Sequence, residues 1–194
     1  METADYLRLM HSFCSHSAHK PAIAATLATA QATIIAAQNI VTQYGGFLTH
    51  SDFVPHNFRI ADNKMYLLDF SAIRFGNKHE SWARFLNFMT LYHPALEAAF
   101  LKYFSDNRAP EEYQSLHLMR LYRLGEIITY YQKTLDRSAD KLRELNLARI
   151  DFWHDVLRAE IAHERITEDR RLAYTALRDS LRSDEEKMRQ IGLH

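Results

Sequence analysis

The chain contains the segment Leu48-Thr-His-Ser-Asp-Phe-Val-Pro-His-Asn-Phe-Arg-Ile60, and a second segment, Leu67-Leu-Asp-Phe-Ser71, follows it closely. In the first segment an apolar lead-in enters a polar loop that contains Asp52, and a short apolar run resumes after Asn57. A polar tetrad separates this run from a second apolar run, which ends at Asp69. Two short strand-like runs on either side of an Asp-Asn pair predict a β-hairpin.

Four polar residues would meet at one end of this hairpin, namely His50, Asp52, Asn57 and Asp69. Phosphoryl transfer needs a carboxylate that orients and deprotonates a hydroxyl. It also needs oxygen ligands for the Mg²⁺ that neutralises the nucleotide phosphates. Asp52 suits the first role, and Asn57 with Asp69 suits the second. The arrangement therefore points to phosphoryl transfer.

The order of these residues resembles the catalytic loop and metal-binding triplet of the protein-kinase-like fold. The similarity is greatest to the aminoglycoside phosphotransferase and choline kinase family of small-molecule kinases, whose pattern is HxDxxxxN followed by an Asp after the next strand. The resemblance implies an ATP-dependent enzyme in which Asp52 is the catalytic base. It also implies that Asn57 and Asp69 hold Mg²⁺ and with it the nucleotide, and that His50 holds the loop by hydrogen bonds.

The resemblance extends from about residue 3 to about residue 92 and covers only the C-terminal lobe. Tyr6-Leu-Arg-Leu-Met-His11 is similar to the end of the helix that opens this lobe in the family. Family members then carry an Asp-Leu-Ala-Arg-like segment, whose Asp braces the catalytic loop. Here the segment is Ser81-Trp-Ala-Arg84, so Ser81 replaces that Asp, and Glu80 is a candidate substitute one position earlier.

The N-terminal lobe of a kinase-like protein is not recognisable in this chain. There is no Gly-x-Gly pattern, and no strand-borne Lys precedes residue 50. Three explanations stay open: a piece of a longer kinase, a partner chain that supplies the other lobe, or a degenerate relative kept as a binding module. We expect weak or absent nucleotide binding by this chain alone. We also expect its uncovered apolar surface to promote self-association.

Composition is that of a folded domain without a strong charge bias. Of the 194 residues 47% are hydrophobic, and Lys plus Arg and Asp plus Glu both number 24, which gives no electrostatic reason to expect nucleic acid or a membrane as partner. The single Cys14 excludes an internal disulfide and fits a reducing compartment. Residues 21–41 are too weakly hydrophobic to span a bilayer. A cytoplasmic location is therefore expected.

Apolar periodicity predicts a mainly α fold with one small β-hairpin. The expected helices cover residues 3–13, 21–44, 80–89, 94–104, 111–135 and 139–162. Residues 71–79 are expected to be irregular, and residues 105–110 to form a loop. Residues 1–162 would form the kinase-like catalytic lobe, and residues 163–194 a charged helical tail that docks weakly.

The acceptor hydroxyl is left open among amino alcohols, aminoglycosides and sugars. Two other classes of function compete with the kinase. The first is a non-catalytic pseudokinase or helical interaction module. The second is a metal-dependent hydrolase that uses His50, Asp52 and His56, although no further Cys or His is placed to complete its metal site.

Overall fold

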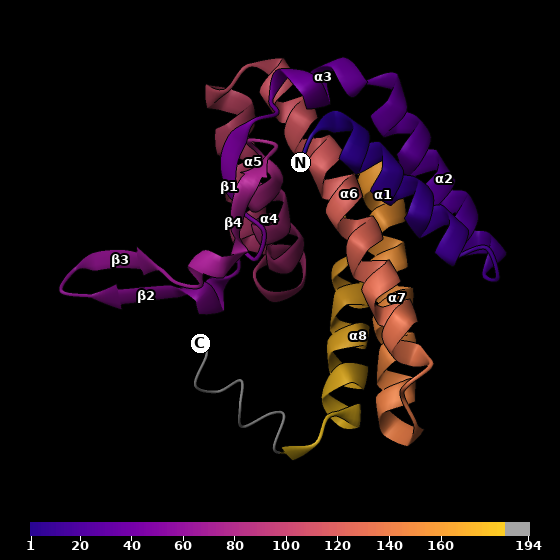
Figure 1. Ribbon diagram of the computed structural model, residues 1–194. Helices are drawn as coiled ribbons and strands as arrows, with labels where there is room; N and C mark the ends of the chain where they lie inside the picture. The colour runs from indigo at the N-terminus through magenta and orange to yellow at the C-terminus, as the bar shows by residue number, and fades with distance from the viewer. Residues whose placement is uncertain (185–194) are drawn as a thin grey trace. The chain divides into compact units, whose positions relative to one another are not determined.

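Helices make up most of the fold, as the periodicity predicts. The computed structural model describes residues 1–184 (Figure 1). Contacts divide the chain into two compact units. Unit 1 comprises Met1–Leu9 and Ala32–Arg123, and unit 2 comprises Met10–Gln31 and the described residues from 124 onward. Within residues 1–184, no helix combines the length and the apolar character needed to cross a bilayer.

The helices fall close to their predicted positions. They are α1 (Thr3–His16), α2 (Pro21–Ala36), α3 (Gln38–Gln43), α4 (Glu80–Tyr92), α5 (Pro94–Asn107), α6 (Pro110–Leu135), α7 (Asp140–Ile161) and α8 (Glu168–Leu181). Two boundaries were predicted wrongly. The helix expected at residues 21–44 breaks at Ala37, whose φ of −114° and ψ of 28° are not helical. The loop expected at residues 105–110 is shorter, because α5 continues to Asn107.

The predicted hairpin is confirmed. Strands β2 (Phe58–Ala61) and β3 (Lys64–Leu67) pair antiparallel, with Phe58 opposite Leu67. Asp62 and Asn63 connect them with φ values of 51° and 58°, and a two-residue hairpin turn with both φ values positive matches the twist of the flanking strands. Figure 1 shows the hairpin projecting from the rest of unit 1.

A second pair of strands corrects the expectation that residues 71–79 are irregular. Strand β1 (Phe47–His50) pairs antiparallel with β4 (Ile73–Gly76), and His50 lies opposite Ile73. Gly76 ends β4 where side chains from three other segments crowd it. A Cβ there would lie 2.8 Å from Oε2 of Glu80 and 2.9 Å from the Tyr6 hydroxyl. Residues 77–79 connect the end of β4 to the first turn of α4.

The core of unit 1 contains buried apolar side chains and a buried ion pair. Helices α4 and α6 contribute apolar side chains that are essentially inaccessible to solvent: Ala83, Leu86, Leu116, Leu118, Met119 and Leu121. The Tyr6 ring meets Tyr122 edge-on, with centroids 5.0 Å apart. A buried ion pair joins Arg120 to Glu97 at 2.6 Å, and Asn87 accepts a hydrogen bond from the same guanidinium at 3.0 Å. Burial of these charges is supported by their mutual hydrogen bonds.

Unit 2 includes the segment that was expected to dock weakly. Helix α8 packs on α7, where the ring of Tyr174 stacks on Phe152 with centroids 4.1 Å apart. Tyr174 is only 2% exposed. Arg170 pairs with Asp155 at 2.7 Å. The tail is thus helical over Glu168–Leu181 and buries Tyr174 and Arg178. The part of the prediction that concerns residues 185–194 lies outside the described residues.

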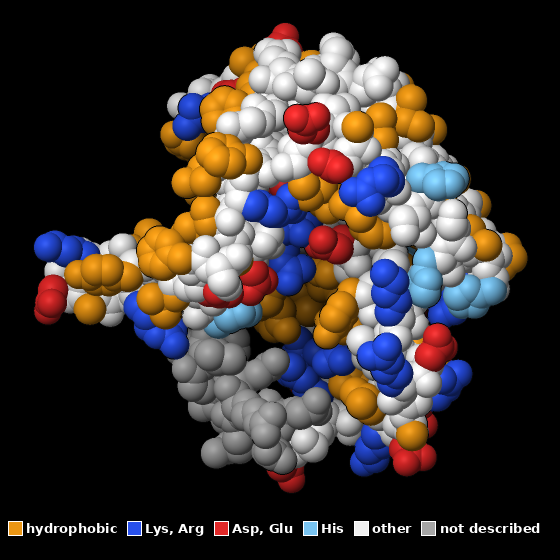
Figure 2. Space-filling view, viewed as in Figure 1, with side chains coloured by type: hydrophobic (Ala, Val, Ile, Leu, Met, Phe, Trp, Pro, Cys, Tyr) orange, Lys and Arg blue, Asp and Glu red, His pale blue; other side chains and the backbone are white. Residues whose placement is uncertain are grey.

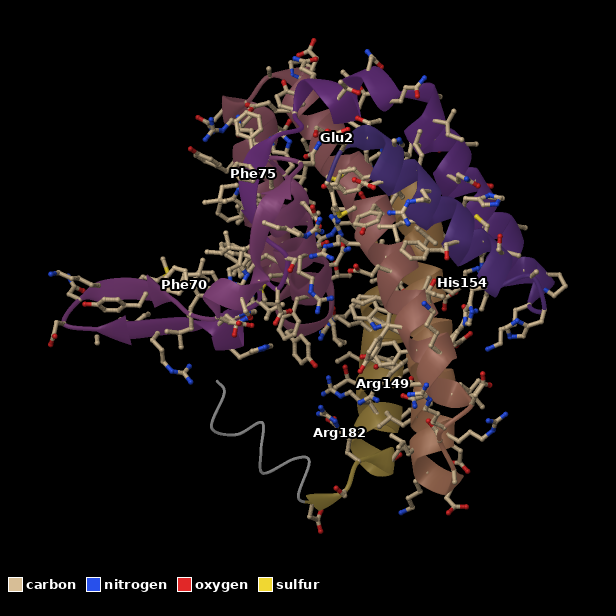
Figure 3. The ribbon with its side chains drawn as sticks, in the orientation of Figure 1. Glu2, Phe70, Phe75, Arg149, His154 and Arg182 are labelled. Atoms are coloured by element: carbon tan, nitrogen blue, oxygen red, sulfur yellow. The ribbon has the colours of Figure 1, made fainter. Side chains whose placement is uncertain are left out.

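An exposed apolar face covers both small sheets of unit 1. Cross-strand partners Leu48 and Phe75 are each 66% exposed, and the hairpin pair Ile60 and Met65 is 80% and 70% exposed. Phe70, between the sheets in sequence, is 74% exposed. Figure 2 shows hydrophobic side chains along the hairpin, and Figure 3 labels Phe70 and Phe75. A face of this kind is the apolar surface on which the expected self-association depends.

Candidate active site

The hairpin brings the predicted site residues to the end of β2 and β3 that lies nearest the rest of unit 1. The amide of Leu68 donates to the carbonyl of Asn57 at 2.8 Å, so Asn57 lies beside the residue that precedes Asp69. Nε2 of His50 lies 3.0 Å from the carbonyl oxygen of Leu68. Because a carbonyl only accepts, His50 carries its hydrogen on Nε2 and is a donor here. The loop, both strands and the residue before Asp69 are therefore joined by direct hydrogen bonds.

Asn57 is oriented by the residue proposed as base. It ends a 3₁₀ turn (Pro55–Asn57), and its side-chain Nδ2 donates to the carbonyl of Asp52 at 2.7 Å and to Oδ2 of the same residue at 3.1 Å. The amide nitrogen is thus committed to the loop. An amide oxygen is an acceptor with two lone pairs, and it is this atom that a Mg²⁺ ion would take as a ligand.

Asp69 has an unusual backbone conformation. Its φ of 61° and ψ of 61° are left-handed, and it precedes a 3₁₀ turn (Phe70–Ala72) that leads into β4. Asp and Asn enter this region more readily than other non-glycine residues, and Asp62, Asn63 and Asp140 also have a positive φ. The side chain is exposed, and the hydroxyl of Ser71 donates to Oδ1. A fixed, exposed carboxylate therefore stands directly after β3.

Ser81 holds the start of the loop. Its hydroxyl oxygen accepts from the amide of His50 at 2.8 Å and donates to the carbonyl of the same residue at 3.2 Å. It also lies 2.6 Å from the hydroxyl of Thr49. The position that carries a bracing Asp in the family is thus filled by a serine that contacts the loop backbone directly.

Glu80 supports the same loop less directly. Its carboxylate is completely buried, accepts from the Tyr6 hydroxyl at 2.6 Å and pairs with Arg74. Arg123 lies 3.6 Å from it and donates to the carbonyl of Ser51, the residue before Asp52. Burial and the nearby charge of Glu80 raise the pKa of Tyr6, so its hydroxyl stays protonated and remains a donor. The link from the Glu80 carboxylate to the loop therefore runs through Arg123, which contacts both.

Two arginines of the site had no predicted role. Nη2 of Arg84 lies 3.2 Å from Oδ1 of Asp52, and Arg123 reaches the preceding peptide. Arg84 follows Ser81 by three residues on α4, so the same helix face meets the loop. That spacing is a signal that could have identified Arg84. Arg123 is on α6, far away in sequence, and no local pattern indicates its contact.

The types of oxygen donor in the loop decide which metal ion the residues would suit. Asn57 and Asp69 supply one amide and one carboxylate oxygen, and magnesium in proteins takes few side chains while keeping water and phosphate oxygens. Within residues 1–184, no three His, Cys, Asp or Glu side chains form a group that could hold a metal ion. For the hydrolase alternative, Nε2 of His56 is 3.8 Å from Asp52, and Nε2 of His50 is committed to the Leu68 carbonyl. No contact favours that alternative.

The chain matches no protein-family model, no characterised protein and no solved structure. Support for a function therefore comes from the residues of this site and their geometry.

Proposed function

We propose that this chain is the catalytic lobe of a cytoplasmic, ATP-dependent phosphotransferase of the kinase-like fold that acts on a hydroxyl of a small molecule. One observation carries the proposal: the Asn57 amide nitrogen is bound to both the backbone and the carboxylate of Asp52. This geometry joins a base and a metal ligand in one loop. The loop is tied through Leu68 to the exposed carboxylate of Asp69.

In the proposed reaction the acceptor hydroxyl attacks the γ-phosphorus of ATP. Its proton passes to Asp52, the new O–P bond forms, and the bond to ADP breaks with its electron pair leaving on ADP. Mg²⁺, held by Asn57 and Asp69, would neutralise phosphate charge. The hydrogen bonds of Ser81 to the backbone of His50 keep the loop in place, so that Asp52 is already oriented when the substrates arrive.

Nucleotide binding tests the proposal without knowledge of the acceptor. ATP at millimolar concentration is titrated calorimetrically into the wild type, Asp69→Ala and Asp106→Ala, with and without Mg²⁺. Asp106 is an exposed aspartate on α5 that pairs with Lys102 at 2.8 Å, so it is a matched control. We expect weak Mg²⁺-dependent binding that Asp69→Ala abolishes and Asp106→Ala preserves.

The opposite result points to another class of protein. Absence of Mg²⁺-dependent binding in the wild type would favour a non-catalytic interaction module. Bound zinc in the purified protein that is lost on His56→Ala would favour the hydrolase.

A further inference from the structure

Arg84 contacts the proposed base with part of its guanidinium and leaves the rest unused. Nη2 lies 3.2 Å from Oδ1 of Asp52, a long distance for a charge-assisted hydrogen bond, which is usually about 2.7–2.9 Å. Nε of Arg84 is buried and has no hydrogen-bond partner within the described structure. Buried N–H groups are almost always paired, so an unpaired one calls for an explanation. The side chain that contacts Asp52 therefore keeps one N–H group without an acceptor.

The Asp52 carboxylate has polar contacts besides the one with Arg84. Its other oxygen accepts from Nδ2 of Asn57 at 3.1 Å and lies 3.8 Å from Nε2 of His56. The side chains of Asp52 and Arg84 are 37% and 26% exposed, so solvent or a ligand reaches both. The contact between them can therefore be exchanged without burying an unpaired carboxylate.

The other carboxylates of the site already have their own partners. Glu80 is bonded to the Tyr6 hydroxyl and to Arg74, and Asp69 accepts from Ser71. Within residues 1–184, Asp52 is the only acid that forms an ion pair with Arg84. The Arg84 guanidinium can thus bind one more anion. Its planar shape fits the oxygens of a phosphoryl group.

We propose that Arg84 binds the phosphoryl group that is transferred and exchanges its contact with Asp52 for that group when ATP is bound. The inference rests on the proposed phosphotransferase function. During transfer, negative charge is spread over the equatorial oxygens of the phosphoryl group, where the Arg84 N–H groups donate. The same movement frees Oδ1 of Asp52 to accept the proton of the attacking hydroxyl. Arg84 is then a catalytic residue, because it touches the reacting group.

The contact is specific to the γ-phosphoryl group, so the preference for ATP over ADP reports on it. Dissociation constants for Mg·ATP and Mg·ADP are measured by calorimetry for the wild type, Arg84→Gln, Arg84→Lys and Arg8→Gln. Arg8 is exposed on α1 and pairs with Asp5, so it controls for loss of an arginine charge elsewhere. Thermal unfolding of every variant verifies that it is folded.

We expect Arg84→Gln to weaken Mg·ATP binding about tenfold while Mg·ADP binding changes less than about twofold. Arg84→Lys keeps the positive charge but loses the planar, two-pronged guanidinium, so it should retain part of the preference for Mg·ATP over Mg·ADP. Arg8→Gln should retain all of that preference. An unchanged ATP-to-ADP ratio in Arg84→Gln would overturn this inference and leave the proposed function intact. Mg·ATP binding by the wild type that Asp69→Ala leaves unchanged would overturn the proposed function as well.

Discussion

The hydroxyl of Ser81 lies between both backbone polar groups of His50, 2.8 Å from its nitrogen and 3.2 Å from its oxygen. A single side chain from the first turn of α4 therefore sets the path of the chain as it leaves β1. Asp52 follows two residues later, so its position depends on this contact. The hydroxyl of Ser81 therefore braces the backbone at the start of the loop.

Ser81→Ala tests this contact. Loss of the hydroxyl leaves the amide of His50 without its acceptor, at a cost of about 1–3 kcal/mol in the free energy of unfolding. The amide of His50 should then exchange with solvent much faster, while amides in α5 keep their rates. Hydrogen exchange followed by NMR measures both. Ser81→Thr retains a hydroxyl and is the control. Equal exchange of the His50 amide in wild type and Ser81→Ala would disprove the bracing role.

Glu80→Gln tests the indirect support. Glu80 is fully buried between Tyr6 and Arg74, with Arg123 nearby, and neutralising one member of a buried ion pair costs about 3 kcal/mol. Urea denaturation measures the loss. The matched control is Glu168→Gln, which breaks the pair between the exposed carboxylate of Glu168 and Arg171 and should cost much less than Glu80→Gln. Similar losses of unfolding free energy in the two variants would show that the buried contacts of Glu80 stabilise the fold no more than the contact of Glu168 does.

Stability should depend on pH through His79. Burial, reinforced by Lys78, lowers the pKa of His79 from 6.5 to about 4. The unfolded chain therefore binds this proton at a higher pH than the folded protein does. The stability contribution is complete above pH 6.5, declines as the pH falls towards 4, and its total loss is about 3 kcal/mol at most.

Urea denaturation at several pH values between 4 and 7 measures this decline. His79 packs edge-on against Tyr44 and Phe104, so His79→Phe keeps an aromatic ring and should flatten the pH dependence. His11→Gln, at an exposed histidine, should leave the slope as it is in the wild type. An unaltered slope in His79→Phe would assign the pH dependence to other groups.

Self-association should occur through the exposed apolar face. Leu48 and Phe75 are cross-strand partners, and each is 66% exposed. Replacing Phe75 by Ser removes a large apolar side chain from this face and should shift the protein towards monomer. Sedimentation velocity over a range of concentrations follows the shift, with Tyr103→Ser, an exposed aromatic on α5, as control. A wild type that is monomeric at all concentrations would contradict this prediction.

Local sequence patterns predicted the elements that depend on local contacts. The helices follow from the spacing of apolar residues, and the hairpin follows from Asp62-Asn63 between two short apolar runs. Strand β4 was missed because its hydrogen bonds go to β1, and a four-residue strand has no periodicity of its own. The break at Ala37 also lacks a local signal, since no Gly or Pro marks it.

The candidate site was predictable in part for the same reason. His50, Asp52, Asn57 and Asp69 are close in sequence, and one hairpin suffices to bring them together. Arg123 comes from α6, and its contact with the Ser51 carbonyl exists only after the helices of unit 1 have packed. The replacement of a bracing acid by Ser81 was visible in the sequence. That its hydroxyl bonds both backbone groups of His50 required coordinates.

The most direct test of the central claim is the calorimetric titration of ATP into the wild type and Asp69→Ala, each with and without Mg²⁺. If Asn57 and Asp69 hold the metal of a nucleotide site, the wild type binds ATP only with Mg²⁺ and Asp69→Ala does not bind it. Binding that is independent of Mg²⁺, or of equal strength in the two proteins, would contradict a phosphotransferase site at the end of this hairpin.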